Sequence, residues 1–195
     1  MTESQWDKFL HIKTSGRDDS HSNQYRFPYE PTPYPVLLRL ANSGYIRKKN
    51  IFLDYGCGKG RVDLFLAYQI GCRCIGVEYD ERIYSNACKN KMTAVSGGKV
   101  EIINTKAEDY PVPPEVDRIY FFNPFSVEIF KRVISRLWES WDGRELLLFF
   151  YYISDEYIRW LSDVHGLLLV DEIDCRDLFE GNNSRERIMV YQFGY

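Results

Sequence analysis

Three glycines at alternate positions follow an apolar segment that ends in Asp54: Gly56, Gly58 and Gly60. Because glycine has no side chain, a ligand can lie against the bare backbone of such a loop, near the N-terminus of the helix that follows. A second acidic residue, Glu78, ends the next apolar segment, 18 positions after Gly60. At this interval a carboxylate reaches the two ribose hydroxyls of a nucleotide and discriminates against a 2′-phosphate. The spacing therefore predicts a ligand with an unphosphorylated, adenosine-type ribose.

Two ligands fit this pattern, and the details of the loop separate them. A dinucleotide fingerprint, G-x-G-x-x-G, would place its third glycine at position 61, where this chain has Arg61. Asp54 would also repel a pyrophosphate, whereas it would attract the ammonium group of an amino-acid moiety, directly or through water. The loop therefore favours S-adenosylmethionine (SAM) over NAD as the cofactor.

Residues 54–60, Asp-Tyr-Gly-Cys-Gly-Lys-Gly, resemble the first motif of the class I SAM-dependent methyltransferases, and residues 76–80, Gly-Val-Glu-Tyr-Asp, resemble their second. The resemblance implies that the glycine loop approaches the methionine part of SAM and that Glu78 binds the ribose. The residues expected to bind the cofactor on this basis are Asp54, Tyr55, Gly56, Cys57, Gly58, Gly60, Glu78, Tyr79, Ala107, Glu108 and Asn123.

Residues 104–110, Asn-Thr-Lys-Ala-Glu-Asp-Tyr, resemble the loop that holds the adenine in this superfamily. Many members have an acidic residue just before the alanine, where this chain has Lys106, and a cation cannot accept a bond from the adenine amino group. Either Glu108 or Asp109 takes over that role, or the backbone around Ala107 reads the base. The alternative for the two acids is a purely electrostatic role at a helix N-terminus.

Asn123-Pro124-Phe125 is similar to the N/D-P-P-Y/F motif of methyltransferases that act on amino nitrogens, although the second proline is missing. In such enzymes the Asn side chain accepts from the target NH₂ group and aligns its lone pair with the methyl group. Asn123 is therefore predicted to act on the acceptor. Tyr34, an aromatic residue of the N-terminal arm that could stack against the acceptor, is predicted to act with it. The alternatives are that Asn123 caps a helix beginning near Ser126 and that Tyr34 only packs beneath its own segment.

These residues need a framework that brings the ends of several strands together. Strands are expected at residues 51–55, 73–78, 100–104, 118–122, 145–152, 167–173 and 188–193, and helices between them at 61–70, 81–92, 127–138 and 155–164. Short apolar runs that alternate with helical segments indicate a largely parallel sheet covered on both faces. We expect an α/β, Rossmann-like fold with seven strands, the last two antiparallel at one edge.

The chain divides in composition near residue 50. Residues 1–49 begin polar and become rich in aromatic residues and proline, which predicts an arm without regular structure that lies across the domain. A short helix is expected at 36–44, ended by Gly44. Residues 50–195 would form the SAM-binding methyltransferase domain, and the aromatic rings of the arm would cover the ligand or pack beneath the arm.

The overall composition limits the partners. The net charge of −3 argues against strong nonspecific attraction to nucleic acid or anionic membranes, and no segment reads as membrane-spanning. The five cysteines lack metal-site spacing and fit a reducing cytoplasm. We expect no metal, a monomer or homodimer, and an unidentified methyl acceptor, for which a small molecule or protein side chain is favoured over RNA. The alternatives are a SAM-binding sensor subunit without catalysis and a dinucleotide-dependent oxidoreductase.

Overall fold

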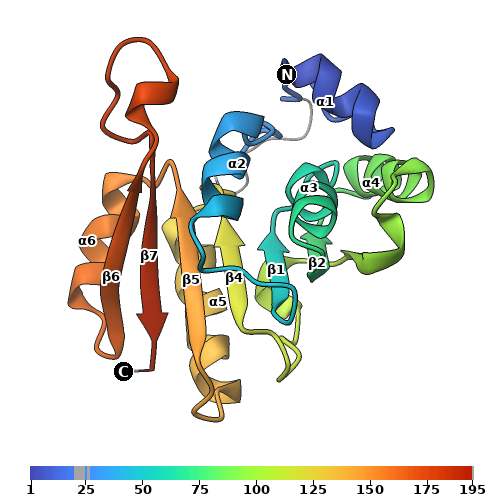
Figure 1. The fold of residues 1–195 in the computed structure, drawn as a ribbon. Helices are drawn as coiled ribbons and strands as arrows, with labels where there is room; N and C mark the ends of the chain where they lie inside the picture. Colours follow the sequence, from blue (N-terminus) through green and yellow to red (C-terminus); the bar gives the residue numbers. More distant parts are fainter. Residues whose placement is uncertain (20–24, 26, 195) are drawn as a thin grey trace.

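The computed structural model describes residues 1–19, 25 and 27–194, and Figure 1 shows its fold. Seven strands form one sheet in the order β3-β2-β1-β4-β5-β7-β6. The strands are β1 (Ile51–Tyr55), β2 (Arg73–Glu78), β3 (Val100–Asn104), β4 (Arg118–Phe121), β5 (Leu146–Tyr151), β6 (Leu167–Asp174) and β7 (Arg187–Phe193). The first five strands run parallel to one another, and β7 lies between β5 and β6 and is antiparallel to both. The predicted Rossmann-like sheet with a reversed final pair is confirmed.

Helices cover both faces of the sheet (Figure 1). They are α1 (Glu3–Leu10), α2 (Tyr34–Asn42), α3 (Arg61–Gln69), α4 (Glu81–Thr93), α5 (Val127–Ser140) and α6 (Asp155–Asp163), with a 3₁₀ turn, η2, at Ala107–Asp109. Side chains alternate along each strand, so Phe52 packs into the core under α2 and α3 while Leu53 packs into the core under α5 and α6. None of the described helices is long and apolar enough to cross a membrane.

Two elements of the first 49 residues differ from the prediction. Helix α1 forms where an irregular beginning was expected, because the Thr2 side chain accepts from the Gln5 N–H and the Gln5 side chain accepts from the Thr2 N–H. Helix α2 begins at Tyr34, two residues before the predicted start, because Pro35 falls in its first turn, where no backbone donor is required.

The loop between β1 and α3 needs its glycines for conformational reasons as well as for space. Gly56, Gly58 and Gly60 have φ values of 80°, 56° and 81°, in the left-handed region that other residues seldom adopt. With these three glycines the chain passes from the end of β1 over the end of β2 and into α3 within five residues. The Gly56 N–H donates to the Val77 carbonyl at 2.9 Å, which fixes the loop against β2.

Candidate functional site

A cavity lies at the C-terminal ends of β1, β2 and β4, where the sequence places its acidic and polar residues. Five of the predicted cofactor residues line it: Gly56, Gly58, Glu78, Tyr79 and Ala107. The other lining residues come from the arm, from the ends of β2, β3 and β4, and from the start of α4: Asp18, Phe27, Pro28, Tyr29, Glu30, Val77, Asp80, Ile83, Thr105, Phe122, Pro124 and Phe125. In an open α/β sheet this edge is the usual ligand-binding position.

Glu78 ties the glycine loop to the end of β2. One carboxyl oxygen accepts from the Gly58 N–H at 3.0 Å, and the other accepts from the Asp80 N–H at 2.9 Å. Burial raises the pKa of Glu78 to about 7, against the opposing effect of backbone donors at Asp80, Gly58 and Tyr79. A carboxylate has about four lone-pair positions, so the side chain can still accept from a ribose hydroxyl. The position of Glu78 therefore fits the ribose role.

The arm lies directly on the glycine loop. A Cβ atom at Gly58 would come within 2.3 Å of two carbons of the Tyr29 ring, and one at Gly56 would come within 2.6 Å of Pro124 Cβ. The Tyr29 hydroxyl donates to the Thr14 carbonyl at 2.5 Å, which holds the ring in place. The bare backbone that the sequence predicted for a ligand is therefore partly covered by the chain itself.

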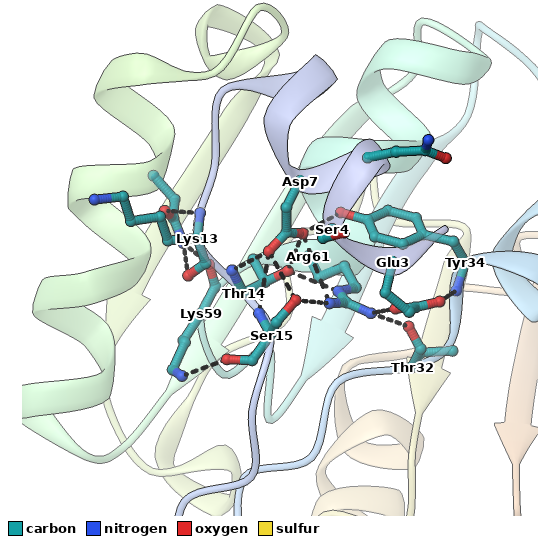
Figure 2. Close-up of polar contacts among 12 residues, drawn as sticks. Glu3, Ser4, Asp7, Lys13, Thr14, Ser15, Thr32, Tyr34, Lys59 and Arg61 are labelled. Atoms are coloured by element: carbon teal, nitrogen blue, oxygen red, sulfur yellow. Dashed lines mark hydrogen bonds and ion pairs between the residues drawn. The ribbon is translucent and has the colours of Figure 1, made fainter. Parts of the chain in front are cut away.

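Arg61 anchors the arm to the first turn of α3 (Figure 2). This buried side chain donates from Nε to Thr14 Oγ1 at 2.7 Å, from Nη1 to the Thr32 carbonyl at 3.2 Å, and forms an ion pair with Glu3 of α1. Asp7 completes the anchor, because its carboxylate accepts from the backbone and hydroxyl of Thr14 at 2.7 Å. The residue that replaces the third glycine of a dinucleotide loop thus joins three separate segments.

Tyr34 belongs to this anchor and not to the cavity. Its side chain is fully buried, its hydroxyl donates to Asp7 at 2.7 Å, and the Arg61 guanidinium lies 4.3 Å from the centre of its ring. Burial and the bond to Asp7 raise the pKa of the hydroxyl. This position gives Tyr34 no contact with a ligand in the cavity, and the catalytic role predicted for it finds no support in the geometry.

Four other predicted residues do not line the cavity. Tyr55 packs into the opposite core, where its ring stacks on Phe121 at 5.4 Å, and Gly60 is the N-cap residue of α3. Glu108 lies in η2 beside Ala107 but does not line the cavity. Cys57 is buried behind the loop and lines a smaller cavity. Of Ala107, Glu108 and Asp109, Ala107 alone is among the described residues that line the cavity, and recognition of the adenine by the backbone there stays a prediction.

Asp54 also lines the smaller cavity, and it has an acidic neighbour that the sequence analysis missed. Burial raises the pKa of Asp54 well above its usual value, and the charges of Asp63 and Glu78 raise it further. Asp63, in the first turn of α3, is fully buried, and neither of its carboxyl oxygens has a hydrogen-bond partner among the described residues. Burial raises its pKa to about 8. An acidic residue in a first helical turn is so common that its sequence position gave no signal.

Asn123 has an unused acceptor next to the cavity. Its backbone adopts a left-handed conformation, with φ of 42°, between the lining residues Phe122 and Pro124. Its Oδ1 is buried and has no hydrogen-bond partner among the described residues. The alternative role as a helix cap is wrong, because the N-cap residue of α5 is Ser126. The Pro124 carbonyl accepts from the Phe27 N–H at 3.3 Å, so the arm is bound to the residue that follows Asn123.

Comparisons with known proteins agree with this geometry. Residues 52–140 match the family model described as a methyltransferase domain. The chain is 33% identical over 90 residues to an H3 lysine-79 specific histone-lysine N-methyltransferase of Dictyostelium discoideum, covering 46% of this chain and 4% of that protein. It is also 33% identical over 72 residues to a protein-lysine N-methyltransferase of Saccharolobus islandicus, covering 36% of this chain and 45% of that protein. The chain thus spans less than half the length of both relatives.

Solved structures share the fold. A putative methyltransferase from Escherichia coli superposes with a TM-score of 0.66 at 18% identity, covering 91% of this chain and 98% of that one. An RNA methyltransferase from Salinibacter ruber in complex with S-adenosyl-L-homocysteine superposes with a TM-score of 0.60 at 21% identity, covering 84% and 92%. The glycine loop, the buried Glu78 and these likenesses lead to one conclusion. Residues 52–140 match a methyltransferase domain, and the chain has the fold of solved SAM-dependent methyltransferases.

Proposed function

We propose that this domain is catalytically active and methylates the side-chain amine of a lysine in a protein. The observation that carries the proposal is the charge of the cavity. Its described lining includes four acidic residues, Asp18, Glu30, Glu78 and Asp80, and no lysine, arginine or histidine. Such a lining attracts a single cation and repels the phosphates of a nucleic acid.

The acidic side chains at the mouth are held by exposed arginines. Asp18 pairs with Arg82 at 2.7 Å, and Glu30 lies 3.7 Å from Arg17. These ion pairs orient the carboxylates and weaken their electric field. The remaining negative potential favours one further cation over a polyanion. The relatives support the same acceptor, because both are named for methylation of lysine in proteins.

Asn123 supplies the contact that the chemistry needs. Its unused Oδ1 can accept an N–H of the incoming amine and direct the nitrogen lone pair at the methyl group. The ammonium that the acidic lining attracts must lose one proton to solvent before transfer, because the lone pair of the nitrogen forms the new N–C bond while the S–C bond of SAM breaks. The chain's own residues would bind, orient and cover the two reactants, and no covalent intermediate is required.

The amino group of an RNA base is the second candidate. The Asn123-Pro124-Phe125 segment favours it, since the motif it is similar to serves enzymes that act on base nitrogens as well as on amides. A structural neighbour is also named as an RNA methyltransferase. Both candidates have a nitrogen acceptor and differ in the charge of the molecule that carries it.

Labelled methyl transfer separates these possibilities. The protein is incubated with methyl-tritiated SAM and a cell extract, and the label is followed after protease or ribonuclease treatment. We expect the label in the protease-sensitive fraction, recovered as methyllysine after acid hydrolysis. Label that is lost on ribonuclease treatment would overturn lysine as the acceptor and favour the amino group of an RNA base. Absence of label in every fraction, while SAM still binds in calorimetry, would overturn catalysis and favour the sensor alternative.

A further inference from the structure

Asp63 is an acidic side chain that the proposed reaction does not use. It is fully buried in the first turn of α3 and has no hydrogen-bond partner among the described residues. Burying a carboxylate without a partner costs free energy, so Asp63 either keeps its proton or balances the positive charge of a ligand. The groups around Asp63 are therefore described next.

The β-sheet register places Asp63 beside Asp54. Asp54 of β1 pairs with Gly76 of β2, and paired residues on neighbouring strands direct their side chains to the same face of the sheet. A Cβ atom at Gly76 would come within 2.9 Å of Asp63 Oδ2, so Asp63 lies on this same face. Because Gly76 has no side chain, nothing from β2 separates the two carboxyl groups. Glu78, two residues farther along β2, points to the same face.

The other groups around this Asp54–Asp63 pair supply little compensating charge. From the loop and from β2, the thiols of Cys57 and Cys74 face it, and burial raises the pKa of both, which keeps them neutral. The charge of Lys99 lowers the pKa of the more distant thiol of Cys72, which precedes β2. From α4 the thiol of Cys88 lies near Cys57.

The remaining neighbours lie on the cavity side of Asp54. Tyr120 of β4 is neutral, since burial raises the pKa of its hydroxyl well above the usual value. Arg61 lines the small cavity with Asp54, but its guanidinium is already bound by Glu3, Thr14 and Thr32. Among the residues that the structure describes, the pair therefore has acidic and neutral neighbours and one arginine, Arg61, that is already engaged.

SAM and its product differ in net charge. SAM carries an ammonium, a sulfonium and a carboxylate, and thus one net positive charge, whereas S-adenosylhomocysteine keeps only the ammonium and the carboxylate and has no net charge. We propose that binding of SAM releases a proton from the Asp54–Asp63 pair to solvent, and that the pair thereby distinguishes the cationic SAM from its zwitterionic product. Only an O–H bond is broken on binding, and the proton returns when the methyl group has left and the product dissociates.

The proposal sets the direction of a pH effect. Burial raises the pKa of Asp63 to about 8 and that of Asp54 well above its usual value, so the pair holds its protons at neutral pH before the cofactor arrives. A ligand that expels a proton binds more tightly as pH rises, by at most about tenfold per pH unit. The affinity for SAM should rise in this way, and that for S-adenosylhomocysteine should rise less.

The experiment is isothermal titration calorimetry of the full chain with SAM and with S-adenosylhomocysteine, near neutral pH, in phosphate and in Tris buffer. The dependence of the binding enthalpy on the buffer counts the protons released. We expect SAM to release roughly one proton more than S-adenosylhomocysteine. Equal release for both ligands, or no binding of either, would overturn the proposal. The measurement needs no methyl acceptor, so it fails or succeeds independently of lysine as the substrate.

Asp63→Asn identifies the source of the proton. The variant has one titratable group fewer in the pair, and the asparagine amide can donate to the Asp54 carboxylate and favour its ionised form. It should therefore release fewer protons on binding SAM than the wild type. Asp163→Asn is the matched control, because Asp163 is exposed at the end of α6 and should leave proton release unchanged. Wild-type proton release by Asp63→Asn would overturn the role of the pair. If that variant does not fold, the wild-type comparison of the two ligands still decides.

Discussion

The ring of Tyr29 lies on the backbone of Gly58, with two ring carbons 2.3 Å from the place where a Cβ atom would be. This contact joins the arm to the loop that the sequence marks for the cofactor. Lys59, the next residue, extends its ammonium to 4.5 Å from the centre of the same ring. A ligand that lies along the glycine loop must therefore share this space with Tyr29, and the arm becomes part of the binding site.

Gly58→Ala should disturb the arm and the cofactor site together. The new methyl group collides with the Tyr29 ring, and φ of 56° is strained for alanine. We expect the variant to lose more than about 1 kcal/mol of unfolding free energy in urea, and to bind SAM more weakly in calorimetry. Gly143→Ala is the control, because Gly143 has φ of 89° but nothing within 4 Å of its Cβ position. Equal losses in both variants would show that Tyr29 gives way without cost.

Arg61→Ala should release the arm. The side chain is 3% exposed, and its removal leaves Asp7 buried without its cation. Loss of one partner from such a buried set costs about 3 kcal/mol or more, measured as unfolding free energy in urea. The first 35 residues should also become sensitive to protease. Arg82→Ala removes an exposed pair with Asp18 and should cost less than about 1 kcal/mol. An intact, protease-resistant arm in Arg61→Ala would contradict the anchor.

Much of the fold follows from local patterns. Runs such as 146–151 are buried along their whole length, as expected for strands covered on both faces, and helix-length segments between them require parallel pairing. The positions of the glycine loop after β1 and of Glu78 at the end of β2 could be predicted because each depends on a short spacing within one strand-loop-helix unit. The left-handed φ values of the three glycines explain why that spacing is so informative.

The parts that sequence did not reveal depend on contacts between distant segments. Asp63 became notable only when the register set Gly76 opposite Asp54. Tyr34 looked suited to a ligand because it is aromatic and lies in the arm, yet its hydroxyl is bound to Asp7, 27 positions away. No local pattern fixes such pairings, since they depend on how α1 and the arm dock on α3.

Asn123→Ala should separate catalysis from cofactor binding. It removes the unpartnered Oδ1 that would orient the acceptor nitrogen, so the rate of labelled methyl transfer should fall by up to about a hundredfold while SAM affinity changes far less. Asn182→Ala is a close control, because Asn182 also has a left-handed φ, of 49°, but lies on an exposed loop. A wild-type transfer rate in Asn123→Ala would show that another group positions the acceptor.

The stability of the free protein should fall as the pH rises. Burial raises the folded-state pKa of Glu78 to about 7 and of Asp63 to about 8, both above the values of the unfolded chain. The folded state therefore binds more protons than the unfolded state, and the stabilisation, complete below about pH 4, is lost progressively up to about pH 8. Asp63→Asn mimics the protonated acid and cannot ionise, so its melting temperature should decline less over this range. Melting curves measured by circular dichroism from mildly acidic to mildly alkaline buffer, without SAM, provide the test. Parallel pH profiles for the variant and the wild type would mean that Asp63 is already ionised at neutral pH. In that case a cation must lie beside Asp63 in solution, since the buried carboxylates of Asp63 and Asp54 cannot otherwise remain charged together.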